Sequence, residues 1–159
     1  MKLIILDRDG VINVDSPDYI KSPDEWLPLP RSLTAIARLY QAGYTLAVAT
    51  NQSGVGRGYY SLATLAKMHE KMQQAVIAAG GFIDAIFFCP HTPEEGCDCR
   101  KPKPGLFHQI AAYYQLDLQG VIAIGDSPRD IEAAEQVGCR AIRVSSQHPD
   151  LLSIVDELL

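Results

Sequence analysis

Short apolar segments alternate with amphipathic segments along this chain. Leu3–Leu6 is wholly apolar and runs into the polar turn Asp7–Gly10, a pattern typical of a strand that is buried on both faces. By the same pattern, further strands are expected at residues 44–49, 85–88, 121–124 and 140–144. Apolar residues at helical spacing predict helices at 31–41, 62–76, 106–114, 130–137 and 151–158. Strands separated by helices indicate an α/β fold, a doubly wound parallel sheet covered by helices on both faces.

The length of the chain favours one domain. Its 159 residues suffice for a sizeable core, since domains of this size hide roughly two-thirds of the surface that the unfolded chain exposes. No repeat, linker or low-complexity tract divides the sequence, and no connection between consecutive strands has room for a second folded domain. We therefore expect residues 1–159 to form a single domain, and we expect a monomer.

Charge and hydropathy exclude several classes of protein. A net charge of −5 argues against a nucleic-acid binder, whose affinity rests on a basic surface, but leaves room for a local basic pocket that holds a small anion. No apolar run approaches the roughly 20 residues that span a bilayer, and the opening apolar run stops at Asp7, too early for a secretion signal. We expect a protein of the cytoplasm, with neither a nucleic acid nor a membrane as its partner.

Acidic side chains follow two of the predicted strands at the point where each strand ends. Asp7 and Asp9 come directly after the first strand, and residue alternation points both to one site while Arg8 points elsewhere. Asp126 follows the fourth strand, and ligands gather at the carboxyl ends of such strands. A single Asp at a strand end usually caps a turn, but that interpretation leaves the convergence of three carboxylates unexplained. A hard cation with oxygen ligands, Mg²⁺, would relieve their mutual repulsion.

Further polar residues are expected at the same edge of the sheet. Thr50 and Asn51 follow the second predicted strand. Asp130 lies one helical turn after Asp126 and either supports it or places a favourable charge at a helix start. Two prolines stiffen the segment after Lys101, which favours this lysine as the cation that grips a transferring phosphoryl group.

A glycine-rich loop follows the second predicted strand. Gly54, Gly56 and Gly58 have a spacing that differs from the dinucleotide-binding fingerprint G-x-G-x-x-G. The glycines indicate a flexible loop. It either brings Ser53 or Arg57 to a ligand or forms a plain part of the surface.

Three of the four cysteines lie within eleven residues. Cys89, His91, Cys97 and Cys99 form the pattern Cys-x-His-x5-Cys-x-Cys, whose three thiolates and one imidazole complete a tetrahedral Zn²⁺ site without water. In a reducing compartment such a cluster indicates a metal site rather than a disulfide framework. The inserted loop 89–99 is too irregular to bury a core of its own, so zinc would have a structural role. Four residues without an evident partner are interpreted as core, packing or surface residues: Cys139, His69, His108 and His148.

The motifs around these residues resemble a known superfamily. Asp7-Arg8-Asp9-Gly10, Thr50, Lys101 and Gly125-Asp126 resemble, in order and strand placement, the four signature motifs of the haloacid dehalogenase-like (HAD) phosphohydrolases. Within that superfamily, residues 6–15, 50–58 and 97–102 look like the heptose bisphosphate phosphatases. The resemblance implies a capless enzyme that removes the 7-phosphate of D-glycero-D-manno-heptose 1,7-bisphosphate, a step towards activated heptose for lipopolysaccharide.

The resemblance also implies a role for each matched residue. Asp7 would be the nucleophile that forms an aspartyl-phosphate, and Asp9 the general acid and then the base. Thr50 and Lys101 would neutralise the phosphoryl oxygens. Mg²⁺ would be held by Asp7, the main-chain carbonyl of Asp9, and Asp126. The sugar or its distal phosphate would be contacted by Asp15, Tyr19, Asn51, Gln52, Ser53 and Arg100. The zinc loop would position Arg100 and Lys101, which follow its last ligand.

Three alternatives stay open at this point. The five-residue spacer between His91 and Cys97 also looks like the histidinol-phosphate phosphatases, although residues 13–19 and 53–58 favour the heptose enzymes. A receiver-type phospho-acceptor signalling domain shares the sheet, the acidic cluster and Mg²⁺. Its acceptor Asp ends a middle strand after an earlier acidic pair, whereas the second strand here ends in Thr50, and a zinc loop has no place in it. A zinc-organised binding module gives no reason for Asp7 and Asp9 beside Thr50.

Overall fold

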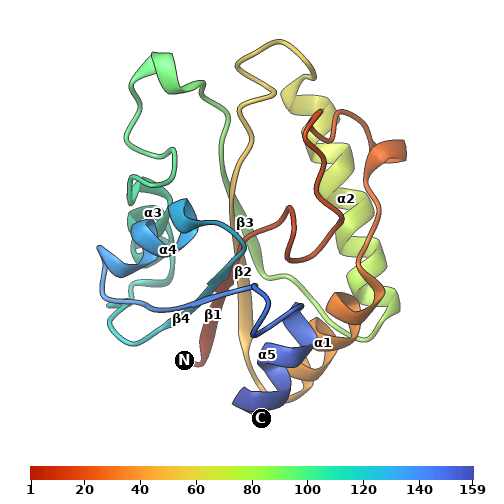
Figure 1. Ribbon diagram of the computed structural model, residues 1–159, viewed down its shortest axis with the longest axis vertical. Helices are drawn as coiled ribbons and strands as arrows, with labels where there is room; N and C mark the ends of the chain where they lie inside the picture. Colours follow the sequence, from red (N-terminus) through yellow and green to blue (C-terminus); the bar gives the residue numbers. More distant parts are fainter.

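The computed structural model describes residues 1–159 and contains one sheet of five parallel strands in the order β3-β2-β1-β4-β5 (Figure 1). The strands are β1 (Leu3–Leu6), β2 (Thr45–Asn51), β3 (Ala85–Cys89), β4 (Ile122–Gly125) and β5 (Arg140–Arg143). β1 is the central strand and pairs with β2 on one side and β4 on the other. The predicted doubly wound α/β architecture is confirmed.

Helices cover both faces of this sheet. α1 (Pro30–Gln41), α2 (Leu62–Ala78) and α5 (Leu151–Leu158) lie on one face, and α3 (Gly105–Tyr114) and α4 (Pro128–Glu135) lie on the other (Figure 1). Two short 3-10 turns, Pro23–Glu25 and Pro93–Glu95, lie in connecting loops. None of the helices combines the length and the apolar character that a bilayer crossing needs.

The packing of β1 explains why every residue of this strand is apolar. Ile4 and Leu6 belong to the core cluster on the side of α1, α2 and α5, while Leu3 and Ile5 belong to the cluster on the other side. All four side chains are buried, because successive residues of a strand point to opposite faces of the sheet. This packing fixes the next residue, Asp7, at the middle of the carboxyl edge.

Several element boundaries differ from the predicted ones by one or two residues, and two of these differences bear on the site. β2 extends to Asn51, two residues beyond the predicted end, because its last residues pair with the end of β3. α4 begins at Pro128 rather than at Asp130, since a carboxylate oxygen of Asp130 accepts a hydrogen bond from the Ser127 N–H (3.1 Å) and caps the first turn. Both differences place residues of the carboxyl edge in regular structure instead of in loops.

The long connection from β1 to α1 packs against α2. Trp26 is fully buried in the larger core cluster, and Lys71 of α2 donates hydrogen bonds to the main-chain oxygens of Pro23 and Trp26 (2.6 and 2.8 Å). α2 itself starts beside its cap residue Ser61, whose hydroxyl accepts a hydrogen bond from the Thr64 N–H. The connection is thereby held beside the carboxyl edge of the sheet.

Candidate active site

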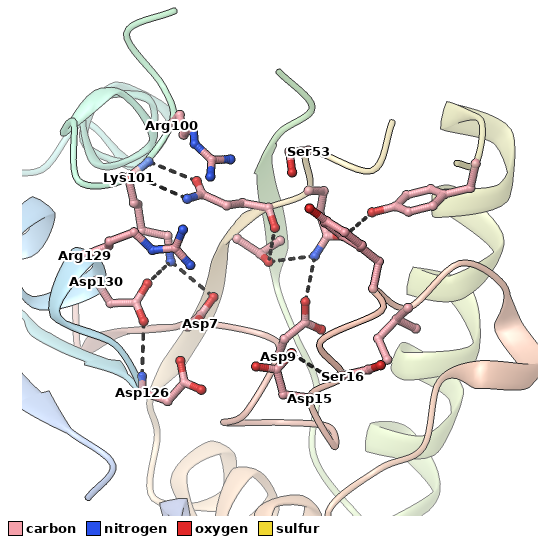
Figure 2. A pocket seen from close by; sticks show the side chains of 16 residues that line it. Asp7, Asp9, Asp15, Ser16, Ser53, Arg100, Lys101, Asp126, Arg129 and Asp130 are labelled. Carbon is pink, nitrogen blue, oxygen red and sulfur yellow. Dashed lines mark hydrogen bonds and ion pairs between the residues drawn. The ribbon is translucent and has the colours of Figure 1, made fainter. Parts of the chain in front are cut away.

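A polar cavity of about 240 Å³ opens at the carboxyl edge of the sheet (Figure 2). Three of its sixteen lining residues are hydrophobic, so the cavity suits a polar ligand. The candidate catalytic, substrate-binding and magnesium-binding residues that line it are Asp7, Asp9, Asp15, Tyr19, Thr50, Asn51, Gln52, Ser53, Arg100, Lys101 and Asp126. The fold therefore brings these candidates together, with Arg100 and Lys101 coming from the segment that follows the cysteine-rich loop. Asp130, whose role was open, lines the same cavity.

Four lining residues were missed by sequence reasoning: Ser16, Ile20, Tyr60 and Arg129. Arg129 stands in the first turn of α4, three positions after Asp126, and that proximity was a usable signal. Tyr60 is buried where the glycine-rich loop ends, and no local pattern marks it because its place depends on how the loop folds. Ser16 and Ile20 lie on the connection from β1 to α1, whose path is set by tertiary packing.

The Lys101 ammonium stands at the centre of the polar network. Its side chain is 2% exposed, and Nζ donates hydrogen bonds to Asp7 Oδ1 (3.1 Å), Asp130 Oδ1 (2.7 Å) and the Ala49 main-chain oxygen (2.7 Å). These bonds use all three protons of the ammonium. Burial disfavours the charged form, but the two carboxylates outweigh it and raise the pKa of Lys101 above its ordinary value. Lys101 is therefore a fixed positive charge beside Asp7.

The carboxylates around this lysine are crowded. Burial, with repulsion from Asp130, Asp9 and Asp126, raises the pKa of Asp7 well above its usual range despite the attraction of Lys101. Burial also raises the pKa of Asp126 to about 6, with a further contribution from Asp130. For Asp130 burial acts in the same direction, but the Lys101 charge and hydrogen bonds to the carboxylate prevail and lower its pKa. One lysine leaves negative charge uncompensated, which favours a bound cation.

Asp9 is held from three directions. Its Oδ1 accepts hydrogen bonds from Arg8 Nε (2.7 Å) and Asn13 Nδ2 (2.9 Å), and its Oδ2 accepts one from Gln52 Nε2 (3.3 Å). Arg8 points away from the cavity, as predicted, because its side chain is fully buried and is not among the lining residues; its Nε nevertheless reaches back to Asp9. With Oδ1 accepting two hydrogen bonds, Oδ2 is the oxygen left to exchange a proton.

Gln52 lies in the cavity wall with its amide atoms already engaged. Nε2 donates to Thr50 Oγ1 (2.9 Å) as well as to Asp9, and Oε1 accepts a hydrogen bond from the Tyr60 hydroxyl (2.7 Å). Burial raises the pKa of Tyr60 to about 12, so its hydroxyl is a donor at neutral pH. Because Thr50 Oγ1 accepts from Gln52, the proton of this hydroxyl remains available for a ligand, with a 3.5 Å contact to the Asn51 main-chain oxygen as its competitor.

The cysteine-rich loop after β3 gathers its four candidate ligands. The donor atoms of Cys89, His91, Cys97 and Cys99 all lie within 4.8 Å of one another, and the cysteines are free thiols. Cys89 Sγ lies 3.5 Å from Cys97 Sγ, and His91 Nδ1 lies 3.3 Å from Cys99 Sγ. A set of three thiols and one imidazole at this spacing fits a closed tetrahedral zinc site. Lys101 follows the last of these ligands by two positions.

The glycine-rich loop packs against the cysteine-rich loop. The Gly56 N–H donates to the Pro90 main-chain oxygen (2.8 Å), and a Cβ at this glycine would lie 2.7 Å from the same oxygen. Ser53 lines the cavity, whereas Arg57 is not among the lining residues; its Nε lies 3.3 Å from Ser53 Oγ and its guanidinium lies over the Tyr19 ring. The loop packs as one wall of the cavity, and Ser53 is the one of its two candidate residues that lines it. The flexibility of the loop stays a prediction.

The residues predicted to have core, packing or surface roles lie outside the cavity. His69 and Cys139 are buried, His108 is exposed, and His148 Nε2 lies 2.9 Å from a carboxylate of α5. These positions agree with the predicted roles.

A family model described as haloacid dehalogenase-like hydrolase matches residues 5–138, a span that contains the acidic cluster, Lys101 and the cysteine-rich loop. The chain belongs to the haloacid dehalogenase-like hydrolases. The predicted superfamily and the predicted hydrolase class are thereby confirmed.

Individual HAD-like relatives are similar over most of this chain. A Pseudomonas aeruginosa protein named D-glycero-beta-D-manno-heptose-1,7-bisphosphate 7-phosphatase is 57% identical over 144 residues, which cover 91% of this chain and 81% of the relative. A Bordetella bronchiseptica protein of the same name is 60% identical over 139 residues, 87% of this chain and 78% of the relative. The crystal structure of D,D-heptose 1,7-bisphosphate phosphatase from B. bronchiseptica, complexed with magnesium and phosphate, superimposes with a TM-score of 0.95 at 49% identity, covering 99% of this chain and 98% of that one.

The donor set of this HAD-like hydrolase fits a magnesium ion. Carboxylate oxygens of Asp7, Asp126 and Asp130 lie within 4.8 Å of one another. Asp126 makes no ion pair and lies over Gly10, where a Cβ would approach Asp126 Oδ2 to 1.9 Å. Both oxygens of Asp130 already accept hydrogen bonds, Oδ1 from Lys101 and Oδ2 from the Asp126 and Ser127 N–H groups, whereas Lys101 engages only one oxygen of Asp7. Asp7 and Asp126 are therefore the side chains available to a cation. That the main-chain oxygen of Asp9 is a third ligand stays a prediction.

Proposed function

We propose that this chain is a Mg²⁺-dependent phosphatase that removes the 7-phosphate of D-glycero-D-manno-heptose 1,7-bisphosphate through an aspartyl-phosphate. The observation that carries the proposal is the contact of Asp7 with the buried Lys101, in a cavity that Asp9 and Asp126 also line. The names of the relatives that are 57% and 60% identical support the choice of substrate. The product would lead to activated heptose for lipopolysaccharide.

Asp7 is the nucleophile in this mechanism. Lys101 holds Oδ1, so Oδ2 is the oxygen left to attack the phosphorus atom of the substrate. The attack forms a bond from Asp7 to phosphorus and breaks the bond between phosphorus and the sugar oxygen. When bound, magnesium would neutralise the charge that Asp7 and the phosphoryl oxygens share, with Asp7 and Asp126 as its side-chain ligands.

Asp9 moves the proton in both halves of the reaction. Its Oδ2 gives a proton to the sugar oxygen as that oxygen leaves, and the same atom then takes a proton from the water that attacks the aspartyl-phosphate. The second attack breaks the bond between Asp7 and phosphorus and releases inorganic phosphate. The hydrogen bonds from Arg8 and Asn13 to Oδ1 keep Oδ2 as the exchanging oxygen.

Thr50 and Lys101 neutralise the phosphoryl oxygens, Thr50 through a hydrogen bond and Lys101 through its charge. The Thr50 hydroxyl accepts a hydrogen bond from Gln52 and retains its own proton for a phosphoryl oxygen. Lys101 supplies a positive charge that needs no reorganisation during the reaction, because burial and three hydrogen bonds hold it in place. Both groups stabilise the charge that shifts onto the phosphoryl oxygens in the transition state.

The outer wall of the cavity would bind the sugar and its second phosphate. Arg100 and Arg129 line the cavity on the side of Lys101, and neither guanidinium has a carboxylate partner (Figure 2). We assign the distal phosphate to these arginines because guanidinium groups match phosphate geometry. The remaining wall residues assigned to the polyol are Asp15, Tyr19 and Ser53. Asn51 and Gln52 line the cavity too, but the hydrogen bonds of their amides indicate a supporting role.

Two alternative functions have less support from the structure. The strand order β3-β2-β1-β4-β5 differs from the 2-1-3-4-5 order of receiver-type folds, which argues against a phospho-acceptor signalling domain. Histidinol phosphate would share the chemistry at Asp7 but has a single phosphate. Arg100 and Arg129, which lie beside Lys101 and have no carboxylate partner, suit a substrate with a second phosphate better than a substrate with one.

Four finer features complete the proposal. Structural zinc at Cys89, His91, Cys97 and Cys99 holds the loop that ends in Arg100 and Lys101. A cysteine cluster that binds zinc instead of forming disulfides suits a reducing compartment, in agreement with an enzyme of the cytoplasm. We also propose that residues 1–159 act as one catalytic domain, because the proposed catalytic groups from both halves of the sequence line one cavity, and as a monomer.

Phosphate release from three substrates tests the proposed function. Heptose 1,7-bisphosphate in both anomeric forms and histidinol phosphate are compared in the presence of Mg²⁺, and ³¹P NMR identifies which phosphate is lost. We expect the highest kcat/KM with a heptose bisphosphate, loss of the 7-phosphate, and no turnover by Asp7→Asn. Preference for histidinol phosphate would overturn the substrate and leave the mechanism standing, whereas full activity of Asp7→Asn would overturn the covalent intermediate.

A further inference from the structure

Arg8 occupies an unusual position for an arginine. Its side chain is fully buried, its only ion-pair partner is the neighbouring Asp9, and its Nη2 atom has no hydrogen-bond partner. A buried ion pair with an unsatisfied nitrogen is poor evidence for a stabilising role, since well-packed apolar side chains of similar volume often serve stability better. We therefore look for the role of this guanidinium in the chemistry of Asp9, the residue that it binds.

The second contact of Arg8 comes from helix α2. Arg8 Nη1 lies 3.3 Å from His69 Nε2, across 61 positions of sequence, and His69 is buried at 8% exposure. Because a guanidinium can only donate, His69 Nε2 must be the acceptor, which requires the neutral ring with its proton on Nδ1. His69 therefore provides an anchor outside the β1 turn for the far end of the Arg8 side chain.

We propose that His69 is a positioning residue for the general acid, because it anchors the Arg8 guanidinium that fixes the Asp9 carboxylate. The inference rests on the proposed function, in which Asp9 Oδ2 gives its proton to the leaving sugar oxygen. Arg8 Nε and Asn13 Nδ2 both bind Oδ1, so the carboxylate keeps Oδ2 as the oxygen that exchanges the proton. Without the acceptor at His69, the guanidinium loses its second anchor and Asp9 loses its fixed rotamer.

Other groups near Asp9 do not replace this anchor. Gln52 Nε2 binds Oδ2 at 3.3 Å, a longer contact than the 2.7 Å bond from Arg8 Nε, and it is shared with Thr50. Asn13 shares its amide nitrogen between Asp9 and the Val14 main-chain oxygen. The Arg8 contact is the shortest of the three and the only one that carries a positive charge.

The test compares two substrates that differ in their need for an acid. The sugar oxygen of heptose bisphosphate must be protonated as it leaves, whereas p-nitrophenyl phosphate releases a stable phenolate that needs no proton. The magnesium-loaded enzyme is assayed as wild type, His69→Leu, His69→Gln and Arg8→Lys, with thermal unfolding as the check of folding. Gln keeps an acceptor for Arg8, Leu removes it, and Lys at position 8 keeps the charge but lacks the planar fork that binds both partners.

We expect His69→Leu to lower kcat/KM for heptose bisphosphate by roughly 10- to 100-fold and to change kcat/KM for p-nitrophenyl phosphate by less than about 3-fold. His69→Gln should recover most of that loss, and Arg8→Lys should repeat the selective loss, which keeps the test decisive if His69→Leu does not fold. Equal losses on the two substrates, or a Gln variant as impaired as Leu, would overturn the inference and leave the phosphatase assignment intact. A wild-type enzyme that hydrolyses neither substrate would overturn the assignment and the inference together.

Discussion

The side-chain amide of Asn51 makes two hydrogen bonds to the main chain of Lys101, accepting one from its N–H (2.9 Å) and donating one to its carbonyl oxygen (3.1 Å). Asn51 is the last residue of β2, and Lys101 follows the cysteine-rich loop, so this pair ties the loop to the sheet. The contact explains how a lysine outside any strand or helix reaches the Asp7 carboxylate with a fixed geometry.

Removal of the Asn51 amide should therefore impair catalysis through Lys101. We expect Asn51→Ala to lower kcat by roughly 10-fold or more and the free energy of unfolding by about 1–3 kcal/mol, because two buried main-chain groups lose their partner. The matched control is Gln73→Ala, since the Gln73 amide makes the same pair of hydrogen bonds to the main chain of Ile83, outside the cavity. Similar stability losses with a kcat effect in Asn51→Ala alone would support the account, whereas equal kcat in the two variants would count against it.

The close approach of Asp126 to Gly10 should make magnesium binding sensitive to this glycine. A Cβ at Gly10 would lie 1.9 Å from Asp126 Oδ2, so Gly10→Ala displaces a proposed metal ligand. We expect the Mg²⁺ concentration for half-maximal activity to rise by about 10- to 100-fold. Gly43→Ala is the control, because Gly43 also has a positive φ (+93 against +83) but meets no atom within 4 Å. An unchanged magnesium requirement in Gly10→Ala would argue against Asp126 as a ligand.

The four donors of the cysteine-rich loop predict a zinc-dependent position for Lys101. We expect Cys99→Ser to lose bound zinc, as measured by elemental analysis, and to lose most of its activity because the loop that carries Lys101 loosens. Cys139→Ser is the matched control, a buried cysteine outside the cluster that should leave zinc content unchanged. A folded, zinc-free and fully active Cys99→Ser enzyme would remove this role of the metal.

Much of the site could be predicted from the sequence, because its main residues stand at fixed offsets from strand ends. Asp7 and Asp126 follow apolar strands that are central in the sheet, so the parallel arrangement alone brings them together. Tyr60 escaped prediction because it reaches Gln52 through the folding of the glycine-rich loop. The turn of Arg8 back to Asp9 was equally hidden, since strand alternation predicts directions for side chains and not the path of a long guanidinium arm.

For the fold, too, the local sequence pattern predicts the elements, whereas tertiary contacts set their ends and the packing of the loops. The apolar pattern predicted all five strands and all five helices, with errors at their ends. β2 runs on through Asn51 because it pairs with β3, and no local property of Thr50 or Asn51 reveals that pairing. Trp26 is fully buried although its segment has no regular periodicity, because the connection from β1 packs on α2.

The burial of His69 predicts a dependence of stability on pH. Burial, together with the Arg8 charge, lowers the pKa of His69 from 6.5 to about 3, so between these values the unfolded chain binds a proton that the folded chain does not. The contribution of this group to the free energy of unfolding should therefore fall as the pH drops through this window, by up to about 1.4 kcal/mol per pH unit.

The variant His69→Gln isolates this contribution. Urea unfolding of the wild type and of His69→Gln at about pH 7.5 and about pH 5 should give a smaller loss of stability on acidification in the variant, since glutamine does not titrate. Identical losses in the two proteins would mean that His69 is not buried in its neutral form.

The central claim is that Asp7 becomes esterified, and the variant Asp9→Asn tests it most directly with p-nitrophenyl phosphate. The leaving phenolate needs no acid, so the first step proceeds, while the missing base at position 9 slows hydrolysis of the intermediate. We predict a burst of p-nitrophenolate of one equivalent per active site, and a phosphoryl group on Asp7 when acid-quenched protein is digested and sequenced by mass spectrometry. Steady turnover without a burst, or a phosphoryl group on any other residue, would contradict the account.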